Sequence, residues 1–322
     1  MSREIRKILV IKLSALGDFV LALAAMKKIR EAHKRAHITL LTTPPFEALA
    51  KASPYFNAVE TDGRPQGLGE WLALRGRLKA AKYDRVYDLQ TSAQSARIFH
   101  MLAPFPPEWS GIAAGCALPH RNPNRNRMHT LERQADQLKY AGIWPDAPTE
   151  PGSAPGPDLS WVLSRSPQGR PGPGGPRPYV LFVPGGSAHR LDKRWPAERY
   201  GQLGKILAER GYDIVVIGGL QESALARQIQ REVGQARDLT GRTDFAKIAV
   251  LGAKAALVVG NDTGPLHLAA ATGSPTVVLF SSASDPELAA PRGHVTVLRS
   301  GNLGDLSVAE VLQAANALLP PV

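Results

Sequence analysis

Residues 145–178 form a segment in which regular secondary structure is disfavoured. The segment contains ten prolines and six glycines in 34 residues. Because proline lacks a backbone N–H and glycine is highly flexible, we expect neither a helix nor a central strand here. It divides the 322-residue chain into two halves, and each half has the length of an ordinary domain. We therefore predict domains at 1–150 and 179–322, joined by a linker at 151–178.

Apolar runs typical of strands alternate with helical patterns on both sides of this segment. The predicted strands lie at 8–13, 37–42, 85–89, 179–183, 213–217, 255–259 and 276–280. The predicted helices lie at 18–33, 196–210 and 308–319, near 46 and 221, and after 90 and 265. Such alternation indicates βαβ units and parallel sheets. We predict an α/β fold with two doubly wound, Rossmann-like domains that face each other across a cleft, where ligands bind beyond the carboxyl ends of the strands. The last helix is a candidate to pack back on the first domain.

The composition excludes several classes of protein. No window reaches the roughly 18–20 consecutive apolar residues of a membrane-spanning helix, and the N-terminus has no secretory pattern, so we expect a cytoplasmic protein. The single cysteine, Cys116, has no partner for an intramolecular disulfide. The net charge of +11 favours an acidic partner, and nucleic acid, anionic lipid and phosphorylated glycolipid all remain open.

The loop 12–18, Lys-Leu-Ser-Ala-Leu-Gly-Asp, joins the first predicted strand to the first predicted helix. Gly17 allows a tight turn. Asp18 either caps the helix or points its carboxylate toward a ligand, and taken alone capping is the more frequent role. Only one glycine of the dinucleotide-binding G-x-G-x-x-G fingerprint is matched, which argues against a dehydrogenase.

Two later loops have the composition of anion-binding sites. Residues 184–196, Pro-Gly-Gly-Ser-Ala-His-Arg-Leu-Asp-Lys-Arg-Trp-Pro, combine two glycines with hydroxyl and basic side chains, which suits a diphosphate. Residues 260–269, Gly-Asn-Asp-Thr-Gly-Pro-Leu-His-Leu-Ala, place a proline in the first turn of a helix and leave N–H groups for an anion. A solvated basic loop is the alternative for the former, and a structural role is the alternative for His267.

Several catalytic signatures are missing from the sequence. It has no D-x-D, the usual sign of a divalent ion that bridges a sugar nucleotide. We therefore expect no metal, with the phosphate charge met by Lys193, hydroxyl groups and helix ends. It also has no G-x-x-x-x-G-K-[ST], H-E-x-x-H or G-x-S-x-G motif, so a P-loop NTPase, a zincin or a serine hydrolase has little support.

Four short motifs follow one another along nearly the whole chain. They are K-L-S-A-L-G-D at 12–18, Y-D-R-V-Y-D-L-Q at 83–90, D-K-R-W-P at 192–196 and N-D-T-G-P-L-H-L-A-A at 261–270. Each is modest alone, but the set resembles the heptosyltransferases of glycosyltransferase family nine. The resemblance implies a GT-B fold and an inverting transfer of heptose from ADP-heptose to a lipopolysaccharide core acceptor. It implies no cofactor and no nucleic acid, and we expect a monomer with peripheral contact to the inner face of an anionic membrane.

The resemblance also implies roles for individual residues. Asp18 matches the catalytic base, and Lys193 matches the lysine that binds and stabilises the donor phosphates. The other expected donor-binding residues are Ser187, Glu222, Asp262, Thr263, Gly264 and His267, with Glu222 the loosest match, at the nucleoside. The expected acceptor-binding residues are Ser14, Gln90, Arg121 and Arg125. The family often has D-x-Q-G where this chain has Asp-Leu-Gln-Thr at 88–91, so the acceptor side is expected to differ.

Two alternatives remain at this stage. The first is another GT-B enzyme, a nucleotide-sugar epimerase or a transferase of another sugar, which a comparison of ADP-heptose with UDP-sugars would distinguish. The second is a non-enzymatic basic protein that binds nucleic acid or anionic membrane. Such a protein would bind DNA in a strongly salt-dependent way, but the chain has no helix-turn-helix, zinc or RNP-like signature.

Overall fold

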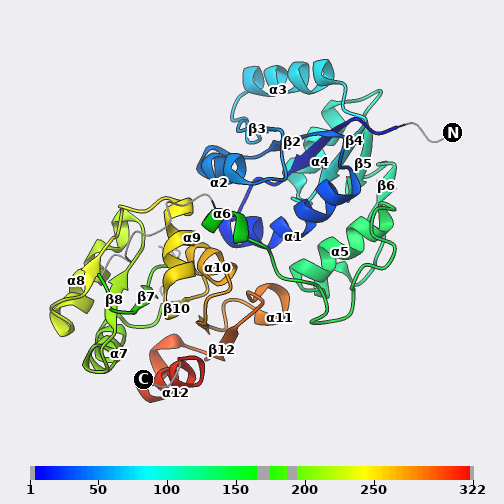
Figure 1. Cartoon of the computed structure of the whole chain (residues 1–322). Helices are drawn as coiled ribbons and strands as arrows, with labels where there is room; N and C mark the ends of the chain where they lie inside the picture. The colour runs from blue at the N-terminus through cyan, green and yellow to red at the C-terminus, as the bar shows by residue number, and fades with distance from the viewer. Residues whose placement is uncertain (1–3, 165–174, 187–193, 320–322) are drawn as a thin grey trace. The chain divides into compact units, whose positions relative to one another are not determined.

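The chain forms two compact units, each built around its own sheet (Figure 1). The computed structural model describes residues 4–164, 175–186 and 194–319. The units are Met1–Pro155 and Gly156–Val322. Their boundary falls inside the predicted linker, whose role as a linker stays a prediction.

The first unit contains a six-stranded parallel sheet with the order β3-β2-β1-β4-β5-β6. Its strands are β1 (Lys7–Ile11), β2 (His37–Leu41), β3 (Ala58–Glu60), β4 (Arg85–Asp88), β5 (Glu108–Gly111) and β6 (Leu118–Pro119). Its helices are α1 (Leu16–Ala32), α2 (Glu47–Ala52), α3 (Leu68–Ala81), α4 (Ala93–Met101) and α5 (Thr130–Tyr140), with the short 3-10 turns η1 (Pro44–Phe46) and η2 (Arg125–Arg127). Strand β1 pairs with both β2 and β4 and so lies at the centre.

Helix α1 follows the apolar spacing of its sequence. Its buried stripe includes Phe19, Leu23, Met26 and Ile29. Because these positions recur every three or four residues, they share one face of the helix, and α1 packs beside α5. Helices α3 and α4 instead contribute Leu74 and Phe99 to a core cluster with Leu9 of β1. The central strand is thus covered by apolar side chains, as a parallel sheet requires.

The second unit repeats this architecture, with the strand order β12-β11-β10-β7-β8-β9. Its strands are β7 (Tyr179–Val183), β8 (Asp213–Val216), β9 (Arg237–Asp238), β10 (Leu257–Asn261), β11 (Thr276–Phe280) and β12 (Val295–Arg299). Its helices are α6 (Ser160–Ser164), α7 (Ala197–Glu209), α8 (Ser223–Glu232), α9 (Phe245–Lys254), α10 (Gly264–Ala270), α11 (Pro286–Ala289) and α12 (Val308–Leu318), with the 3-10 turns η4 (Leu220–Glu222) and η5 (Leu303–Asp305).

Both sheets have the same topology. When the strands of the second unit are renumbered from its own first strand, its order becomes the 3-2-1-4-5-6 of the first unit. The direction of winding therefore reverses between β1 and β4 in one sheet and between β7 and β10 in the other, and doubly wound sheets bind ligands beyond this point. The predicted fold class, α/β with two doubly wound sheets, is confirmed.

The expectation that residues 145–178 contain no helix is wrong at α6. Asp158 accepts a hydrogen bond from the backbone N–H of Ser160 at 3.0 Å, which begins the turn. Trp161 and Val162 are buried, and α6 packs against α9. Tertiary packing of two large apolar side chains thus stabilises one helical turn in a segment whose composition disfavours it.

Helix α12 joins the core of the second unit. Its Val311 and Ala315 are fully buried in the same cluster as Trp195 and Leu203, and the helix packs against α7 and β11. The prediction that this helix also packs on the first domain stays a prediction.

Thr91, in the loop after β4, has a left-handed backbone with a φ of +46°. A β-branched residue is unfavourable there because its Cβ crowds the following carbonyl. This is the position where the resemblance would place a glycine. Thr91 therefore adopts the left-handed backbone conformation that a glycine at this position would adopt without strain.

We expect Thr91→Gly to raise the free energy of unfolding by about 1 kcal/mol, because it relieves this crowding. Urea denaturation measures the change. The control is Thr243→Gly, at a loop position outside the residues with positive φ, where the gain in chain flexibility should lower stability slightly. Equal effects of the two substitutions would contradict the prediction.

Candidate functional site

The loops after β1 and β4 meet at the reversal point of the first sheet. Ile11 of β1 lies opposite Asp88 of β4, so both loops leave the same edge. The side-chain Oε1 of Gln90 accepts the backbone N–H groups of Leu13 at 2.9 Å and Ser14 at 3.2 Å. Gln90, expected at an acceptor, therefore also fixes the loop that carries Ser14.

Lys12 and Asp88 are a buried, oppositely charged pair beneath these loops. Burial raises the pKa of Asp88 to about 6, against the opposing effects of two backbone N–H groups, Ser95 and Lys12. Burial lowers the pKa of Lys12 to about 8, with Asp18 and Asp88 acting in the opposite direction. Near neutral pH both groups are mainly charged, and each compensates the other in a region with little water. Sequence analysis assigned no role to Lys12, although this residue opens the K-L-S-A-L-G-D motif at 12–18.

We expect the stability difference between the wild type and Asp88→Asn to depend on pH. Because the folded pKa of Asp88 is raised, its protonated form stabilises the fold at low pH, and this contribution is lost as pH rises through about 6. Relative to Asp88→Asn, the wild-type free energy of unfolding should fall by about 2–3 kcal/mol between about pH 4 and pH 7. Urea denaturation across this range measures it. A difference that stays constant with pH would contradict the assignment.

Asp18 lies in the first turn of α1 and does not cap it. The N-cap residue is Ala15, without a side-chain cap, so the more frequent role that the sequence suggested is wrong. Among the described residues, the Asp18 carboxylate accepts no hydrogen bond, and its side chain is only partly buried. Its charge raises the pKa of both Lys12 and Arg133, against the larger lowering by burial. A carboxylate close to two cations and without a hydrogen bond to the described part of the chain is available for chemistry.

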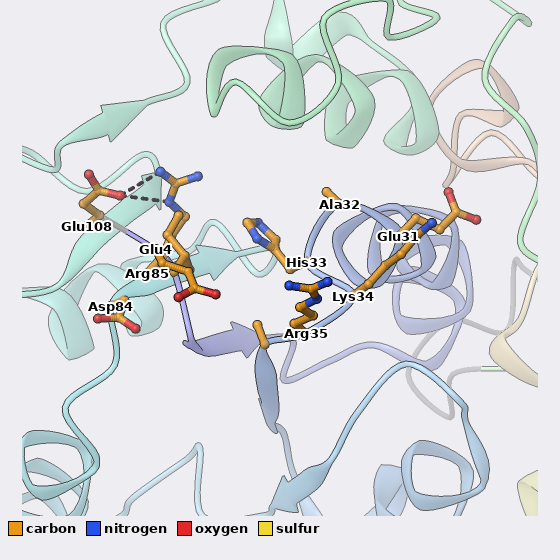
Figure 2. Close-up of a pocket in the computed structure, with 11 residues that line it drawn as sticks. Glu4, Glu31, Ala32, His33, Lys34, Arg35, Asp84, Arg85 and Glu108 are labelled. Carbon is orange, nitrogen blue, oxygen red and sulfur yellow. Dashed lines mark hydrogen bonds and ion pairs between the residues drawn. The ribbon is translucent and has the colours of Figure 1, made fainter. Parts of the chain in front are cut away.

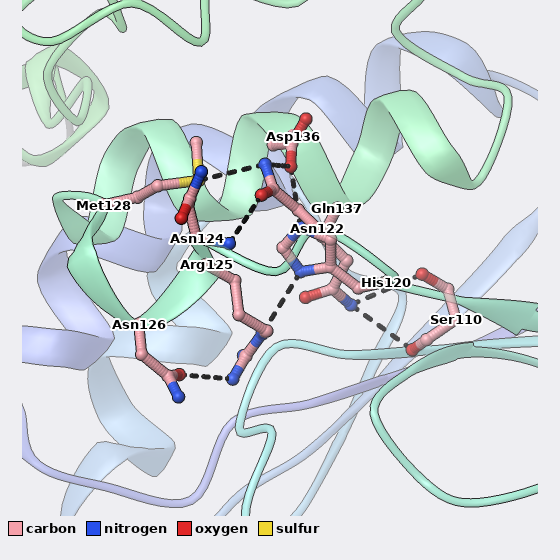
Figure 3. A network of polar contacts seen from close by, with 9 residues as sticks. All are labelled: Ser110, His120, Asn122, Asn124, Arg125, Asn126, Met128, Asp136 and Gln137. Atoms are coloured by element: carbon pink, nitrogen blue, oxygen red, sulfur yellow. Dashed lines mark hydrogen bonds and ion pairs between the residues drawn. The ribbon is translucent and has the colours of Figure 1, made fainter.

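A polar network that includes His120 and Asp136 holds Arg125, one of the residues expected at the acceptor (Figure 3). His120 is bonded through Nε2 to Asp136 at 2.8 Å and through Nδ1 to the Nε of Arg125 at 3.5 Å. Asn122 donates to the same carboxylate at 2.7 Å. Burial lowers the pKa of His120 despite Asp136. The network orients Arg125, whereas Arg121 is exposed.

Asn261, at the end of β10, organises the reversal point of the second sheet. Its side chain is fully buried, and its amide group donates two hydrogen bonds and accepts two. Nδ2 donates to the carbonyls of Pro184 at 2.8 Å and Gly185 at 3.1 Å. Oδ1 accepts the backbone N–H of Trp195 and the hydroxyl of Tyr200, both at 3.1 Å. Asn261 therefore ties down both ends of the 184–195 loop, a role that sequence analysis missed.

The backbone at Gly185 and Gly186 is closely surrounded by side chains. A Cβ on Gly185 would lie 3.0 Å from Cγ of Glu222, and one on Gly186 would lie 3.4 Å from Cγ of Arg194 and 3.9 Å from Cγ2 of Thr263. Arg194 donates to the carbonyl of Gly186 at 2.6 Å. A side chain at Gly185 would therefore displace Glu222 by a few tenths of an ångström, whereas a Cβ at Gly186 would make ordinary contacts.

Three buried polar atoms on the segments that follow β7 and β10 have no hydrogen-bond partner among the described residues. They are Nε of Arg194, Oγ1 of Thr263 and Nδ1 of His267. His267 is held by Asp262, whose Oδ1 lies 3.1 Å from its Nε2, and by a backbone bond to Thr263 at 3.1 Å. Because unpaired buried polar atoms are unfavourable, this arrangement suits a polar ligand.

Glu222, expected at a nucleoside, is buried. Its Oε2 accepts the backbone N–H of Gly219 at 2.7 Å, and its Oε1 lies 3.8 Å from Arg194. The carboxylate thus holds the backbone at Gly219 and also contacts Arg194 of the 184–195 loop. The other two donor predictions, Ser187 and Lys193, lie outside the described residues.

Two further features of the described residues bear on the site. No group of three or more His, Cys, Asp or Glu side chains among them is arranged to hold a metal ion. In the same part of the chain, no helix is long and apolar enough to cross a membrane.

A hollow of about 800 Å³ lies at the opposite edge of the first sheet (Figure 2). It is lined by the C-terminal end of α1 and by residues at the start of β1, β4 and β5, including His33, Asp84, Arg85 and Glu108. Arg85 and Glu108 form an ion pair at 2.7 Å within it. Because ligands of doubly wound sheets bind at the carboxyl edge, this hollow is not the candidate site.

Comparisons with known proteins agree with this architecture. The family model "Glycosyltransferase family 9 (heptosyltransferase)" matches residues 71–310. The lipopolysaccharide heptosyltransferase 2 of Escherichia coli is 27% identical over 327 residues, with 89% of this chain and 86% of that protein covered.

Solved structures also match over nearly the whole chain. The structure of the E. coli ADP-heptose lps heptosyltransferase II has a TM-score of 0.79 at 25% identity, covering 97% of this chain and 98% of that one. A family 9 glycosyl transferase from Veillonella parvula has a TM-score of 0.78 at 20% identity, covering 98% of both chains, and this likeness concerns the fold alone. The GT-B fold class is confirmed. Since the family model covers well over half of its residues, the chain belongs to glycosyltransferase family 9, the heptosyltransferases.

Proposed function

We propose that this chain transfers a heptose from ADP-heptose to a lipopolysaccharide core acceptor, with inversion at the anomeric carbon. Family membership supports glycosyl transfer. The choice of donor and acceptor rests on the E. coli relatives, which are named for ADP-heptose and lipopolysaccharide. The enzyme would act as a cytoplasmic monomer, without nucleic acid, at the inner face of the membrane that carries the acceptor.

The donor would bind at the reversal point of the second sheet. The observation that carries this proposal is the set of buried atoms of Arg194, Thr263 and His267 that have no hydrogen-bond partner among the described residues, with Arg194 and Thr263 beside the backbone of Gly186. Guanidinium, hydroxyl and imidazole groups beside a glycine backbone are suited to phosphate and ribose oxygens. Gly264 continues this turn, and Asp262 orients His267 through its 3.1 Å contact.

Three further residues complete the proposed donor site. Lys193 and Ser187 belong to the same loop and would add a cation and a hydroxyl for the diphosphate. Glu222 would hold the nucleoside only if its Oε1 leaves Arg194, because its Oε2 already accepts the N–H of Gly219. These contacts of Glu222 favour a structural role, in which it holds the Gly219 backbone and Arg194.

The acceptor would bind at the reversal point of the first sheet. Burial lowers the pKa of Lys12 and Arg133, and the charge of Asp18 opposes this shift in both. Asp18 makes no hydrogen bond within the described residues. Ser14 and Gln90 lie in the two adjoining loops, and Arg125 and Arg121 would bind acidic groups of the acceptor.

The reaction would be a single displacement. Asp18 removes the proton from the acceptor hydroxyl as its oxygen attacks the anomeric carbon, and the bond from that carbon to the ADP oxygen breaks. A carboxylate suffices as the base because the hydroxyl becomes strongly acidic only late in the reaction. Lys193 and Arg194 would stabilise the negative charge that grows on the departing diphosphate. No covalent sugar–enzyme intermediate is formed.

We expect transferase activity to persist in excess EDTA, because protein cations and hydroxyl groups meet the phosphate charge in this proposal. The measurement is the initial rate of ADP release before and after dialysis against EDTA. A complete loss that added Mg²⁺ or Mn²⁺ restores would contradict metal-independent transfer.

A donor screen tests the proposed function. Purified protein is incubated with a deacylated core oligosaccharide and with ADP-heptose, ADP-glucose, UDP-glucose or UDP-N-acetylglucosamine in turn. The masses of the products are then measured by mass spectrometry. We expect addition of one heptose with ADP-heptose alone. Transfer from a UDP-sugar, or epimerisation of the donor without transfer, would replace this proposal with the corresponding activity.

A further inference from the structure

Among the described residues of the first unit, three large apolar side chains are more than half exposed. Leu68 is 77%, Leu72 is 58% and Phe105 is 90% exposed. We propose that they belong to a docking face for an anionic lipid bilayer. This α3 face consists of Leu68, Leu72, Lys79, Lys82 and Phe105. The inference rests on the proposed function in one respect, that the acceptor is carried by a membrane.

The α3 face runs along the helix and onto the loop between α4 and β5. Positions 68, 72 and 79 share one side of a helix, because they are four and seven residues apart, while Leu74 and Leu78 are buried on the other side. Lys79 donates to the carbonyl of Ala103 at 3.2 Å. The loop that carries Phe105 therefore begins beside the C-terminal half of α3, and Figure 1 shows the helix at the periphery of its unit.

The charge of this region complements anionic lipid. Residues 64–82 contain five Lys or Arg and one acid, Glu70. Arg77 is neutralised by ion pairs with Glu60 and Asp62. Lys79 and Lys82, together with Phe105, line a hollow of about 570 Å³. The two acids of its lining are already engaged, Asp84 by the backbone N–H groups of Arg6 and Lys7 and Glu108 by Arg85. Each such cation near an anionic surface contributes about 1 kcal/mol to binding.

The residue types favour a membrane over a protein partner. Helix α3 has apolar residues on two sides, one packed on the core through Leu74 and the other exposed at Leu68 and Leu72. Exposed apolar side chains with lysine nearby suit a lipid interface. The centres of protein interfaces are instead depleted in lysine. The long lysine side chains would let their ammonium groups reach lipid phosphates while the apolar side chains enter the acyl region.

The α3 face begins beside the proposed acceptor site. The guanidinium of Arg64 donates to the hydroxyl of Ser14, and α3 starts four residues later, after Gly67. Docking of Leu68 and Leu72 on the bilayer would therefore hold the loop of Ser14 and Asp18 close to the membrane surface. A glycolipid acceptor could then reach the carboxylate without leaving the bilayer.

Vesicle co-sedimentation of the full chain tests the docking face. The vesicles contain phosphatidylcholine alone or with phosphatidylglycerol. We expect binding to the anionic vesicles only, weakened by salt. The triple variant Leu68→Gln, Leu72→Gln, Phe105→Ser should lower the partition coefficient about tenfold or more. The matched control is Leu220→Gln in the second unit, which is also 77% exposed and should bind like the wild type.

Activity separates this inference from the proposed function. The triple variant should keep wild-type turnover with a deacylated acceptor and lose turnover with acceptor embedded in vesicles. If the wild type transfers no heptose to either acceptor, the proposed function fails while sedimentation still tests docking. Equal sedimentation of the wild type and the triple variant would overturn the docking face. So would a change from dimer to monomer in the triple variant without vesicle binding by the wild type, because the face would then join two copies.

Discussion

Replacing Asp18 with asparagine is expected to lower kcat by about 10²- to 10⁴-fold, the usual effect of losing a general base. The amide has nearly the same shape but cannot take up the acceptor proton. Because the proposed donor residues belong to the other unit, affinity for ADP should stay at the wild-type value. The substitution also leaves no broken hydrogen bond within the described residues, so the fold should be retained.

The measurements are the steady-state rate with saturating ADP-heptose and the affinity for ADP by calorimetry. Glu47→Gln is a matched control, because Glu47 is likewise an acid in the first turn of a helix, α2, and its loss removes the same favourable interaction with the helix dipole. We expect this control to keep wild-type kcat. An Asp18→Asn enzyme as fast as the control would refute the role of Asp18.

Replacing Asn261 with alanine is expected to lower the free energy of unfolding by about 3–5 kcal/mol, because four buried hydrogen bonds are lost together. The backbone of Trp195 and the hydroxyl of Tyr200 would lose their acceptor. The carbonyls of Pro184 and Gly185 would lose their donor. Both ends of the 184–195 loop would then be released, so affinity for ADP should also fall, by about tenfold.

Urea denaturation and calorimetry with ADP measure these two effects. The control is Asn316→Ala, since Asn316 is exposed and accepts one hydrogen bond from Arg210, and a change below about 0.5 kcal/mol is expected. If Asn261→Ala does not fold, Tyr200→Phe removes one bond of the four and should cost about 1 kcal/mol. An Asn261→Ala protein as stable as the control would show that Asn261 does not tie down the loop.

The central strands and the loops that follow them could be predicted from sequence. The strand predicted at 179–183 coincides with β7, and the motif loops after β1, β4, β7 and β10 all lie at a reversal point. Local signals suffice here because buried parallel strands are short apolar runs. Strands β3, β5, β6, β9 and β12 were not predicted. Three of them, β3, β6 and β9, have only two or three residues, too few to show an alternation of apolar and polar side chains.

The partners of the site residues could not be predicted, because they come from distant parts of the chain. His120 and Asp136 are 16 residues apart and Asn261 and Pro184 are 77 apart. No local pattern shows which asparagine will meet which carbonyl. The burial of Asp88 with Lys12 and the use of Glu222 to hold the Gly219 backbone likewise appear only once the sheets are assembled.

Heptosyl transfer by a single displacement is tested most directly by the NMR spectrum of the product from ADP-heptose and a deacylated core oligosaccharide. We expect one new heptose whose anomeric configuration is opposite to that of the donor, as attack by the hydroxyl that Asp18 deprotonates requires. A product that retains the donor configuration, or an acceptor without added heptose, would contradict this mechanism.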